Sequence, residues 1–231
     1  MAITTDAHGS RHLTNSGASE ATGKIGNAAY IGSGNLLSLA SDAGIEFVGA
    51  DFYCCCWLKF DATPTNWEVP STKRPGATTG GEWQIRIGPG TSGLLQAVFY
   101  GTGGDVLIDS DLTPTPGVWY FVEWGVSASG TTGFICVNRG TEATDTVAVD
   151  ESGSTLYVGS DGAGFSLNGS IDQFAIFSLV PDASNRNSIY NSGAGRAYAN
   201  LSSTTGLVAF YELGETPSSG GAKNMTLLGV G

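Results

Sequence analysis

Short apolar segments separated by turn residues constrain the fold of this chain more than any other feature. The clearest occupies residues 52–60, Phe-Tyr-Cys-Cys-Cys-Trp-Leu-Lys-Phe, and on an extended strand successive side chains point to opposite faces. Such segments recur about every ten to fifteen residues with Gly, Pro, Asn and Asp between them, a pattern typical of an all-β sandwich. Further strands are expected at 83–87, 94–100, 118–126, 134–138, 156–158 and 171–177.

The composition indicates one large β domain. Of the 231 residues, 41% are apolar, 13% are charged and 35 are glycine. The chain therefore has enough apolar side chains for a core and favours tight turns over long solvated helices. A β sandwich of this length is often a single domain, and we predict one domain over 1–231. The stretches 63–81 and 101–117 are rich in Pro and Gly and are expected to be loops.

One short helix is expected near 184–192. Asp182 follows Pro181 and offers an N-cap, and Gly193 offers a stop after about two turns. No other segment has the pattern of a helix.

The charge and hydropathy of the chain argue against two classes of partner. The formal net charge is −11, from 10 Lys and Arg against 21 Asp and Glu. Phosphate backbones favour clustered cations, and no such cluster is present, so nucleic acid is not expected. No apolar run approaches the roughly 20 residues that span a bilayer, and residues 1–6 lack the features of a signal peptide. We therefore expect a protein that is made in a cytoplasm and does not insert into a membrane.

The four cysteines have an unusual arrangement, because Cys54, Cys55 and Cys56 are consecutive and Cys136 stands apart. Adjacent cysteines rarely satisfy disulfide geometry, and three successive side chains cannot converge on one metal ion. The favoured interpretation is that they are small buried hydrophobes. The alternative is an interchain disulfide formed after release into an oxidising medium.

Six phrases along the chain resemble, in the correct order, the laminin-G-like, concanavalin A-like jelly-roll family. The first reads Gly-Lys-Ile-Gly-Asn-Ala-Ala-Tyr-Ile, and the last reads Ile-Tyr-Asn-Ser-Gly. The resemblance implies two antiparallel sheets packed face to face, one of them concave, in a jelly-roll sandwich. Modules of this type are common in bacteriophage structural proteins. The phrases lie at 23–31, 51–60, 117–122, 136–140, 158–174 and 189–193.

The two ends of the chain carry similar phrases, at 6–17 and at 218–229. In the family that the chain resembles, a strand like 207–213 normally precedes such a phrase at the start of the domain. Here that strand precedes only the second copy. We predict that it completes a sheet, within the chain or by exchange between subunits, because an open edge exposes unpaired backbone groups. The alternative is a leftover of an ancestral tandem array. The expected assembly residues are Leu207, Val208, Phe210, Tyr211 and Leu213.

The resemblance also implies a structural calcium ion, held by hard oxygen ligands. Asp6 and Asp172 occupy matching positions in an opening turn and a late strand. The alternative is that Asp6 caps a turn and that Asp172 pairs with backbone donors.

The sequence gives little sign of catalysis. Glucanases of this architecture place two carboxylates on one strand at alternate positions, and glycoside hydrolysis requires such a pair. No Glu-x-Asp-x-x-Glu phrase occurs, Glu123 stands alone on its strand, and Asp150 and Glu151 are adjacent and would point apart. We therefore expect a protein that is not an enzyme.

Glycan binding would require an exposed aromatic side chain with polar groups beside it. Trp57 and Trp119 match core positions of the family that the chain resembles. The candidates for a sugar platform are Trp67, Trp83 and Trp124, and the alternative for each is simple packing.

These observations favour a non-enzymatic structural or adhesion module on the surface of a bacteriophage virion, as a capsid decoration or tail component. Its partners would be other virion proteins or copies of itself. The fold usually works outside cells, and release of particles by lysis would reconcile this with the missing export signal. The alternative is a lectin-like module that binds host or environmental glycans.

Overall fold

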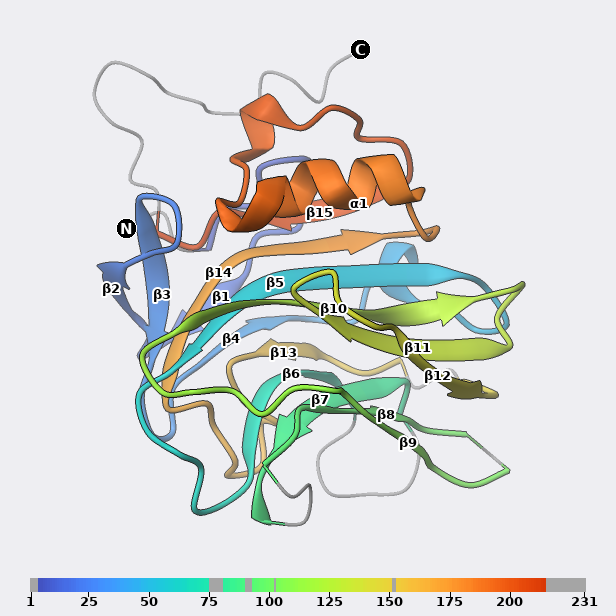
Figure 1. Ribbon diagram of the computed structural model, residues 1–231, viewed down its shortest axis with the longest axis horizontal. Helices are drawn as coiled ribbons and strands as arrows, with labels where there is room; N and C mark the ends of the chain where they lie inside the picture. The colour runs from blue at the N-terminus through green and yellow to red at the C-terminus, as the bar shows by residue number, and fades with distance from the viewer. Residues whose placement is uncertain (1–3, 75–80, 90–92, 102, 151–152, 215–231) are drawn as a thin grey trace.

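The computed structural model describes residues 4–74, 81–89, 93–101, 103–150 and 153–214. Two antiparallel sheets are stacked face to face, and one short α-helix lies on the outer face of one of them (Figure 1). The prediction of an all-β, two-sheet jelly-roll sandwich with one short helix is confirmed.

The first sheet has seven strands and supplies the face that carries the candidate site. Its spatial order is β1 (Thr14–Ser16), β4 (Leu36–Leu39), β13 (Leu156–Val158), β6 (Glu68–Lys73), β7 (Trp83–Ile87), β8 (Gln96–Phe99) and β9 (Val106–Asp109).

The second sheet has eight strands. Seven form the path β12 (Ala143–Thr146), β11 (Thr132–Val137), β10 (Trp119–Ser127), β5 (Phe52–Phe60), β14 (Gly169–Phe177), β3 (Asn27–Ile31) and β2 (Ser19–Thr22), and β15 (Leu207–Tyr211) pairs with β14.

The central strand β5 separates two hydrophobic cores. Phe52, Cys54 and Cys56 point into the main core between the sheets. Tyr53 and Cys55 point the other way, into a smaller core beneath the helix. The alternation expected of this segment is therefore present, but both of its faces are buried. Aromatic and β-branched side chains suit such doubly covered strands.

The four cysteines are buried free thiols. Burial raises the pKa of the Cys136 thiol to about 12 and raises the pKa of the other three thiols above the usual value. The interpretation as small buried hydrophobes is confirmed. The alternative of an interchain disulfide is wrong in this structure, because the thiols do not reach the surface.

Two segments expected to be loops contain strands. β6 lies within 63–81 and β9 lies within 101–117. Pro70 interrupts the apolar pattern of β6, and the pairing of β6 with β7 shifts register between Glu68 and Ser71. Such an irregularity lets proline occupy a strand, which a pattern of alternating residues does not reveal.

The helix α1 (Ala183–Tyr190) is confirmed close to its expected bounds. The Asp182 side chain accepts a hydrogen bond from the Asn185 backbone N–H at 2.8 Å, and Asn191 ends the helix in the left-handed conformation. Within the described ranges, no helix is long and apolar enough to span a bilayer. Three short 3-10 turns lie at Ala43–Ile45, Asn191–Gly193 and Tyr198–Asn200.

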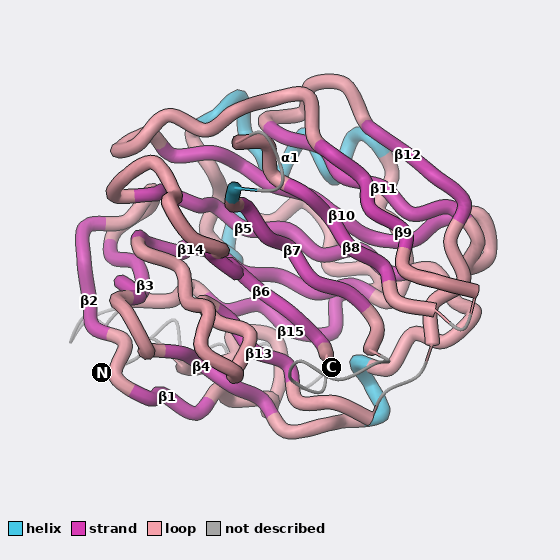
Figure 2. The backbone as a smooth tube through the Cα atoms, turned by 90° about the horizontal axis from the view of Figure 1, so that it is seen from below, coloured by secondary structure: helices cyan, strands magenta, loops and turns pink. Residues whose placement is uncertain are grey.

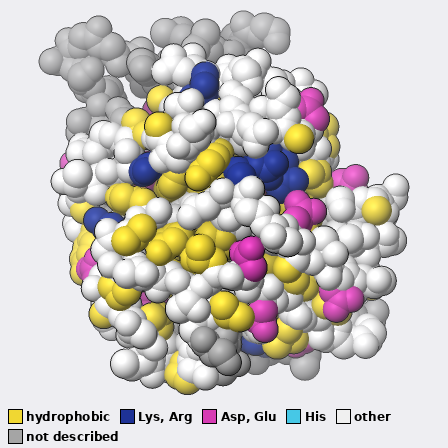
Figure 3. Space-filling view, viewed as in Figure 1, with side chains coloured by type: hydrophobic (Ala, Val, Ile, Leu, Met, Phe, Trp, Pro, Cys, Tyr) yellow, Lys and Arg dark blue, Asp and Glu magenta, His cyan; other side chains and the backbone are white. Residues whose placement is uncertain are grey.

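A buried ion-pair network fixes α1 to the eight-stranded sheet. Glu123 on β10 has no exposed surface. It accepts hydrogen bonds from the Tyr53 hydroxyl at 2.8 Å, from Arg186 Nε at 2.8 Å and from Arg139 Nη1 at 3.1 Å. Arg186 also pairs with the more exposed Glu142 at 3.0 Å. Figure 3 shows Lys and Arg side chains gathered where α1 meets the sheet.

The strand β15 lies against β14 within the same chain, and Leu207, Phe210, Tyr211 and Leu213 are buried. Asp6 joins the start of the described chain to this strand. Its Oδ1 accepts hydrogen bonds from the backbone N–H groups of His8 and Phe210, and its Oδ2 accepts one from Arg11. The second copy of the terminal phrase, at 218–229, lies outside the described residues.

A second buried charge cluster lies between the sheets. Lys73 Nζ donates a hydrogen bond to Glu82 and forms an ion pair with Glu46 at 2.7 Å. The side chains of Lys73 and Glu82 are 1% and 0% exposed. Burial, together with a hydrogen bond to Glu46, raises the pKa of Glu82 to about 8. Glu82 is therefore largely protonated in the folded protein at neutral pH.

This cluster predicts a pH-dependent stability. The folded pKa of Glu82 lies above its ordinary value of 4.5, so its contribution to stability is full below pH 4.5 and is lost as the pH rises through 8. We expect the free energy of unfolding to fall by about 1 kcal/mol per pH unit from this group. Urea unfolding between pH 5 and pH 9 should show a much flatter profile for Glu82→Gln. Asp145→Asn, at an exposed carboxylate on β12, should keep the original slope, and equal slopes in all three proteins would contradict the prediction.

Candidate carbohydrate-binding site

The outer face of the seven-stranded sheet carries polar and charged side chains, because alternate residues of its strands point away from the core. On β7, Trp83, Ile85 and Ile87 enter the main core, whereas Gln84 and Arg86 line a surface pocket. Figure 2 shows the sandwich from the side of this sheet. The helix α1 belongs to the other sheet, so it does not cover this face.

Trp67 lies in the loop immediately before β6, beside Arg86. The Arg86 guanidinium lies over the indole at 4.6 Å from the ring centroid, a distance at which a cation–π attraction operates. Arg86 Nε donates to Gln96 Oε1 at 2.7 Å, and Gln96 Nε2 donates to Asp109 Oδ1 at 2.8 Å. This chain of contacts across β7, β8 and β9 holds the guanidinium against Trp67.

Arg74 lies at the end of β6 on a second aromatic ring. Its guanidinium is 4.5 Å from the centroid of the Tyr100 ring, and Nη1 is 3.1 Å from the Tyr100 hydroxyl. The same hydroxyl donates to Gln84 Oε1 at 3.1 Å. Arg74, Arg86 and Gln84 thus line one pocket of about 190 Å³, together with Trp67, Val69, Asp161 and Phe165.

A short loop presents Phe165 at the edge of this pocket. The Asp161 carboxylate accepts hydrogen bonds from the backbone N–H groups of Ala163 and Phe165, at 2.8 and 2.9 Å. Gly162 has a positive φ, and a Cβ there would meet the Tyr157 ring at 2.5 Å, so the turn requires glycine. The loop leaves the Phe165 side chain 38% exposed, and its internal bonds keep that side chain in place.

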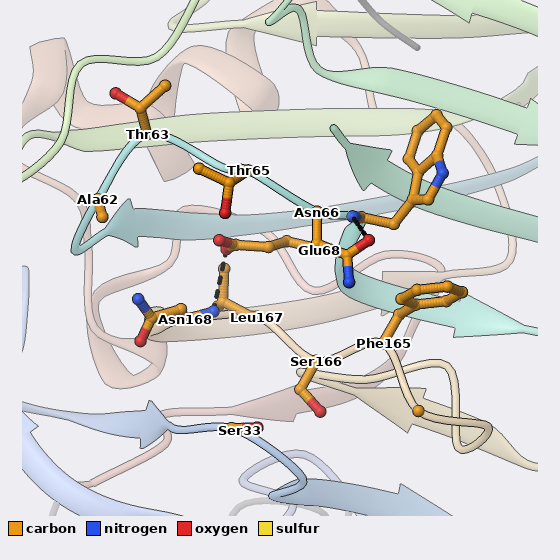
Figure 4. A pocket seen from close by; sticks show the side chains of 12 residues that line it. Ser33, Ala62, Thr63, Thr65, Asn66, Glu68, Phe165, Ser166, Leu167 and Asn168 are labelled. Carbon is orange, nitrogen blue, oxygen red and sulfur yellow. Dashed lines mark hydrogen bonds between the residues drawn. The ribbon is translucent and has the colours of Figure 1, made fainter. Parts of the chain in front are cut away.

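A second pocket of about 330 Å³ adjoins the first and shares Trp67 and Phe165 with it. In Figure 4, Phe165 lies at one end and Asn168 at the other, with Glu68 between them. Glu68 accepts a hydrogen bond from the Asn168 backbone N–H at 3.0 Å, and burial raises the pKa of its carboxyl group. The remaining polar lining is uncharged and comes from Ser33, Thr63, Thr65, Asn66 and Ser166.

Of the three tryptophans predicted to form a sugar platform, only Trp67 reaches a pocket. Trp83 and Trp124 are 1% and 0% exposed, and their rings pack against each other in the main core with centroids 5.4 Å apart. Their prediction as surface platforms is wrong, because both point inward from their strands. The pattern around Trp83 indicated this, since its neighbours at alternate positions are isoleucines.

Four further residues of the site were not predicted from the sequence: Gln84, Arg86, Arg74 and Phe165. The first two could have been found, because they alternate with core residues on one strand and so must point outward. Arg74 and Phe165 follow a strand end and a turn, where no periodic signal applies.

Asp6 and Asp172, the residues proposed to hold calcium, both accept backbone hydrogen bonds. Both Asp6 oxygens accept backbone hydrogen bonds, and Asp172 Oδ2 accepts one from Ile25 at 2.9 Å. Calcium requires six to eight oxygen ligands, and within the described ranges no three His, Cys, Asp or Glu side chains form a group that could hold a metal ion. The alternative, a turn cap and a backbone acceptor, is confirmed, and calcium binding at this pair stays an untested prediction.

Of the carboxylates considered for catalysis, Glu123 lies on the other sheet, and Asp150 donates its backbone N–H to the Tyr100 carbonyl at 3.0 Å. Glu123 is committed to the network beneath α1, and Glu151 lies outside the described residues. Within the first pocket, the one carboxylate of the described lining is Asp161, which is turned toward its own loop. The carboxylate of the second pocket, Glu68, likewise accepts a backbone hydrogen bond, from Asn168.

Three solved structures illustrate what this fold is similar to. Tailspike protein 2 from Escherichia coli O157:H7 bacteriophage CAB120 has 13% identity and a TM-score of 0.61, over 87% of this chain and 29% of that one. The binding domain of botulinum neurotoxin DC in complex with SialylT has 13% identity and a TM-score of 0.59, over 79% and 47% of the two chains. Domain 4 of AbnA, a GH43 extracellular arabinanase from Geobacillus stearothermophilus in complex with arabinotriose, has 16% identity and a TM-score of 0.55, over 78% and 82%.

These likenesses concern the fold alone, and this chain spans less than a third of the tailspike. A comparison with curated proteins gives no match. A family model described as the concanavalin A-like lectin/glucanases superfamily matches residues 26–185. Because this match covers more than half of the chain and agrees with the two-sheet sandwich, the protein belongs to the concanavalin A-like lectin/glucanases superfamily.

Proposed function

We propose that this protein is a non-enzymatic module that binds carbohydrate on the outer face of its seven-stranded sheet. The observation that carries the proposal is the pair Trp67 and Phe165, which lies between two adjoining pockets lined by amide, hydroxyl and guanidinium groups. Aromatic rings bind the apolar faces of sugars, and a few fixed polar groups around them give specificity. The rigid contacts of Arg86 and of the Phe165 loop favour such binding, because these side chains lose little conformational freedom when a ligand binds.

Two of the similar structures are consistent with this proposal. One is described in complex with SialylT and another with arabinotriose. At 13% and 16% identity, they support a general capacity of the fold rather than a particular ligand.

We also propose that the module works on the surface of a bacteriophage particle, as a tail or capsid component. The similarity to a tailspike favours this setting. The acidic net charge of −11 would disfavour non-specific association with nucleic acid. The test is mass spectrometry of purified particles, in which this chain should be detected. Its absence from particles whose genome encodes it would argue against the virion assignment and leave the carbohydrate proposal standing.

The carbohydrate proposal predicts a specific loss in Trp67→Ala. On an array of bacterial and host glycans, retention of the bound glycans should fall at least tenfold, because stacking and shape are removed together. Trp119→Ala is the matched control. Trp119 is also a partly buried tryptophan with a cation over its ring, Lys59 at 5.1 Å, but it lies on the other sheet. Equal retention in the two variants, at unchanged melting temperature, would overturn the proposed site.

A further inference from the structure

The two pockets of the site differ in charge. Arg74 and Arg86 line the first pocket, whereas the second is lined mainly by hydroxyl and amide side chains. We propose that the ligand is an oligosaccharide with a carboxylate-bearing sugar in the first pocket and a neutral sugar in the second. This inference rests on the proposed carbohydrate binding and specifies the class of ligand.

The placement of Arg74 and Arg86 in one pocket is unusual for this chain, which has only 10 cationic residues against 21 acidic ones. The two most buried cations of the described chain are paired with carboxylates, Arg186 with Glu123 and Lys73 with Glu46. Arg86 instead contacts the Trp67 ring and the neutral Gln96 amide, and within the part of the chain that the structure describes it forms no ion pair. Gln96 in turn donates to Asp109, which therefore contacts Arg86 only through the amide.

Within the described residues, the acidic residue inside the pocket does not form an ion pair with Arg86. Asp161 uses Oδ1 to accept from the Ala163 and Phe165 backbone N–H groups, which holds the loop. A ligand carboxylate would therefore meet the Arg86 guanidinium, whose described contacts are with the Trp67 ring and the neutral Gln96 oxygen, and Arg74 lines the same pocket. Burial lowers the pKa of Arg86, and the nearby charge of Arg74 acts in the same direction, although Asp105 and Asp109 oppose it. An anion bound there would offset both the burial of the Arg86 charge and its repulsion by Arg74.

A carboxylate suits this geometry better than a neutral hydroxyl. Guanidinium groups bind planar carboxylates through two parallel hydrogen bonds, and such charge-assisted bonds are about twice as strong as neutral ones. Arg86 donates through Nε to Gln96, so its two Nη groups are the donors that a ligand carboxylate would use. The guanidinium is fixed by Trp67 on its face and by Gln96 at its edge, which favours a defined binding geometry.

The second pocket extends the site by a further sugar unit. It shares Trp67 and Phe165 with the first, so a ligand that crosses these rings enters both. Thr63, Thr65 and Asn66 offer hydroxyl and amide groups there, which match the hydroxyls of a neutral sugar.

The test compares acidic oligosaccharides with their carboxyl methyl esters, which keep the ring and remove the charge. The probes are oligogalacturonate, sialyllactose and a hyaluronan tetrasaccharide, each with its ester, and a sulfated galacto-oligosaccharide. Calorimetry should show at least tenfold tighter binding of an acidic probe than of its ester. Arg74→Gln and Arg86→Gln should reduce that preference to about twofold or less. Arg86→Lys keeps the charge but loses the paired N–H donors of the guanidinium, so it should retain part of the preference.

The outcomes separate this inference from the proposed function. Equal binding of acid and ester, with loss of both in Trp67→Ala, would overturn the carboxylate subsite and leave carbohydrate binding intact. Tighter binding of the sulfated probe than of every carboxylated one would overturn the assignment of a carboxylate. Failure of the unsubstituted protein to bind any of the probes or any glycan of the array would overturn both. Arg139→Gln, at an arginine on the other sheet, should leave the acid-to-ester ratio unchanged.

Discussion

A chain that ends at Gly206 is expected not to form the native sandwich. The truncation removes β15, whose side chains enter both cores: Tyr211 and Leu213 lie in the main core, and Leu207 and Phe210 lie in the core beneath α1. Burial of each large apolar side chain contributes about 1.5–3 kcal/mol, so the summed loss is comparable with the whole stability of a typical domain, about 5–15 kcal/mol. The truncation also exposes the edge of β14 and leaves the buried Asp6 without Phe210. The truncated chain should therefore aggregate or lose its cooperative thermal transition by circular dichroism.

A chain that ends at Gly214 is the matched control, since it keeps every residue of β15. It should unfold cooperatively, near the temperature of the full chain. Addition of a synthetic 207–214 peptide to the shorter chain tests whether this strand has to belong to the same chain or can be exchanged between subunits. Recovery of a soluble, cooperatively melting complex would show that the strand can be supplied by another molecule. A chain ending at Gly206 that remains a soluble monomer with the original melting temperature would contradict the prediction.

The second large effect is expected for Glu123→Gln. This substitution keeps the shape of the side chain but removes the charge that pairs with Arg186 and Arg139. Removing one partner of a buried ion pair typically destabilises a protein by about 3–5 kcal/mol, because the other partner stays buried without compensation. Urea unfolding should show a loss of this size, with the midpoint moved to lower urea and the slope retained.

Glu142→Gln provides the control for the same network. Glu142 also pairs with Arg186, at 3.0 Å, but its side chain is 37% exposed. Exposed pairs contribute about 0–1 kcal/mol, so this variant should unfold close to the original protein. If the two variants lost equal stability, burial of Glu123 would not be the reason for its effect.

The sequence predicted the parts of the fold that depend on strict alternation. Residues 52–60, 118–126 and 171–177 appear as β5, β10 and β14, which lie side by side at the centre of one sheet. The short polar strands at the edges were missed, because β1 and β12 bury little surface and so show no apolar pattern. β6 was missed because proline is typical of loops. The register shift that accommodates this proline arises in the pairing of β6 with β7, which the sequence pattern does not show.

The site was predictable only in part, and for a related reason. Trp67 was proposed because an exposed aromatic side chain can form a sugar platform, but Trp83 and Trp124, proposed for the same role, are buried. Residue type shows what a side chain can do, whereas alternation shows which way it points. Applied to β7, alternation separates the buried Trp83 from the outward Arg86. The meeting of Arg74, Trp67 and Phe165 depends on turns between distant segments, which the sequence pattern does not specify.

The contact of Asp6 with β15 has a further consequence for how the protein could be displayed. This contact and α1 belong to the eight-stranded sheet, which lies above the seven-stranded one in Figure 1. Both pockets are lined by residues of the seven-stranded sheet and of the loops beside it. A support that holds the molecule by its eight-stranded sheet leaves the seven-stranded sheet and its pockets facing outward. Copies arrayed in this way would meet a cell envelope together, and avidity would then convert contacts that are individually weak into lasting attachment.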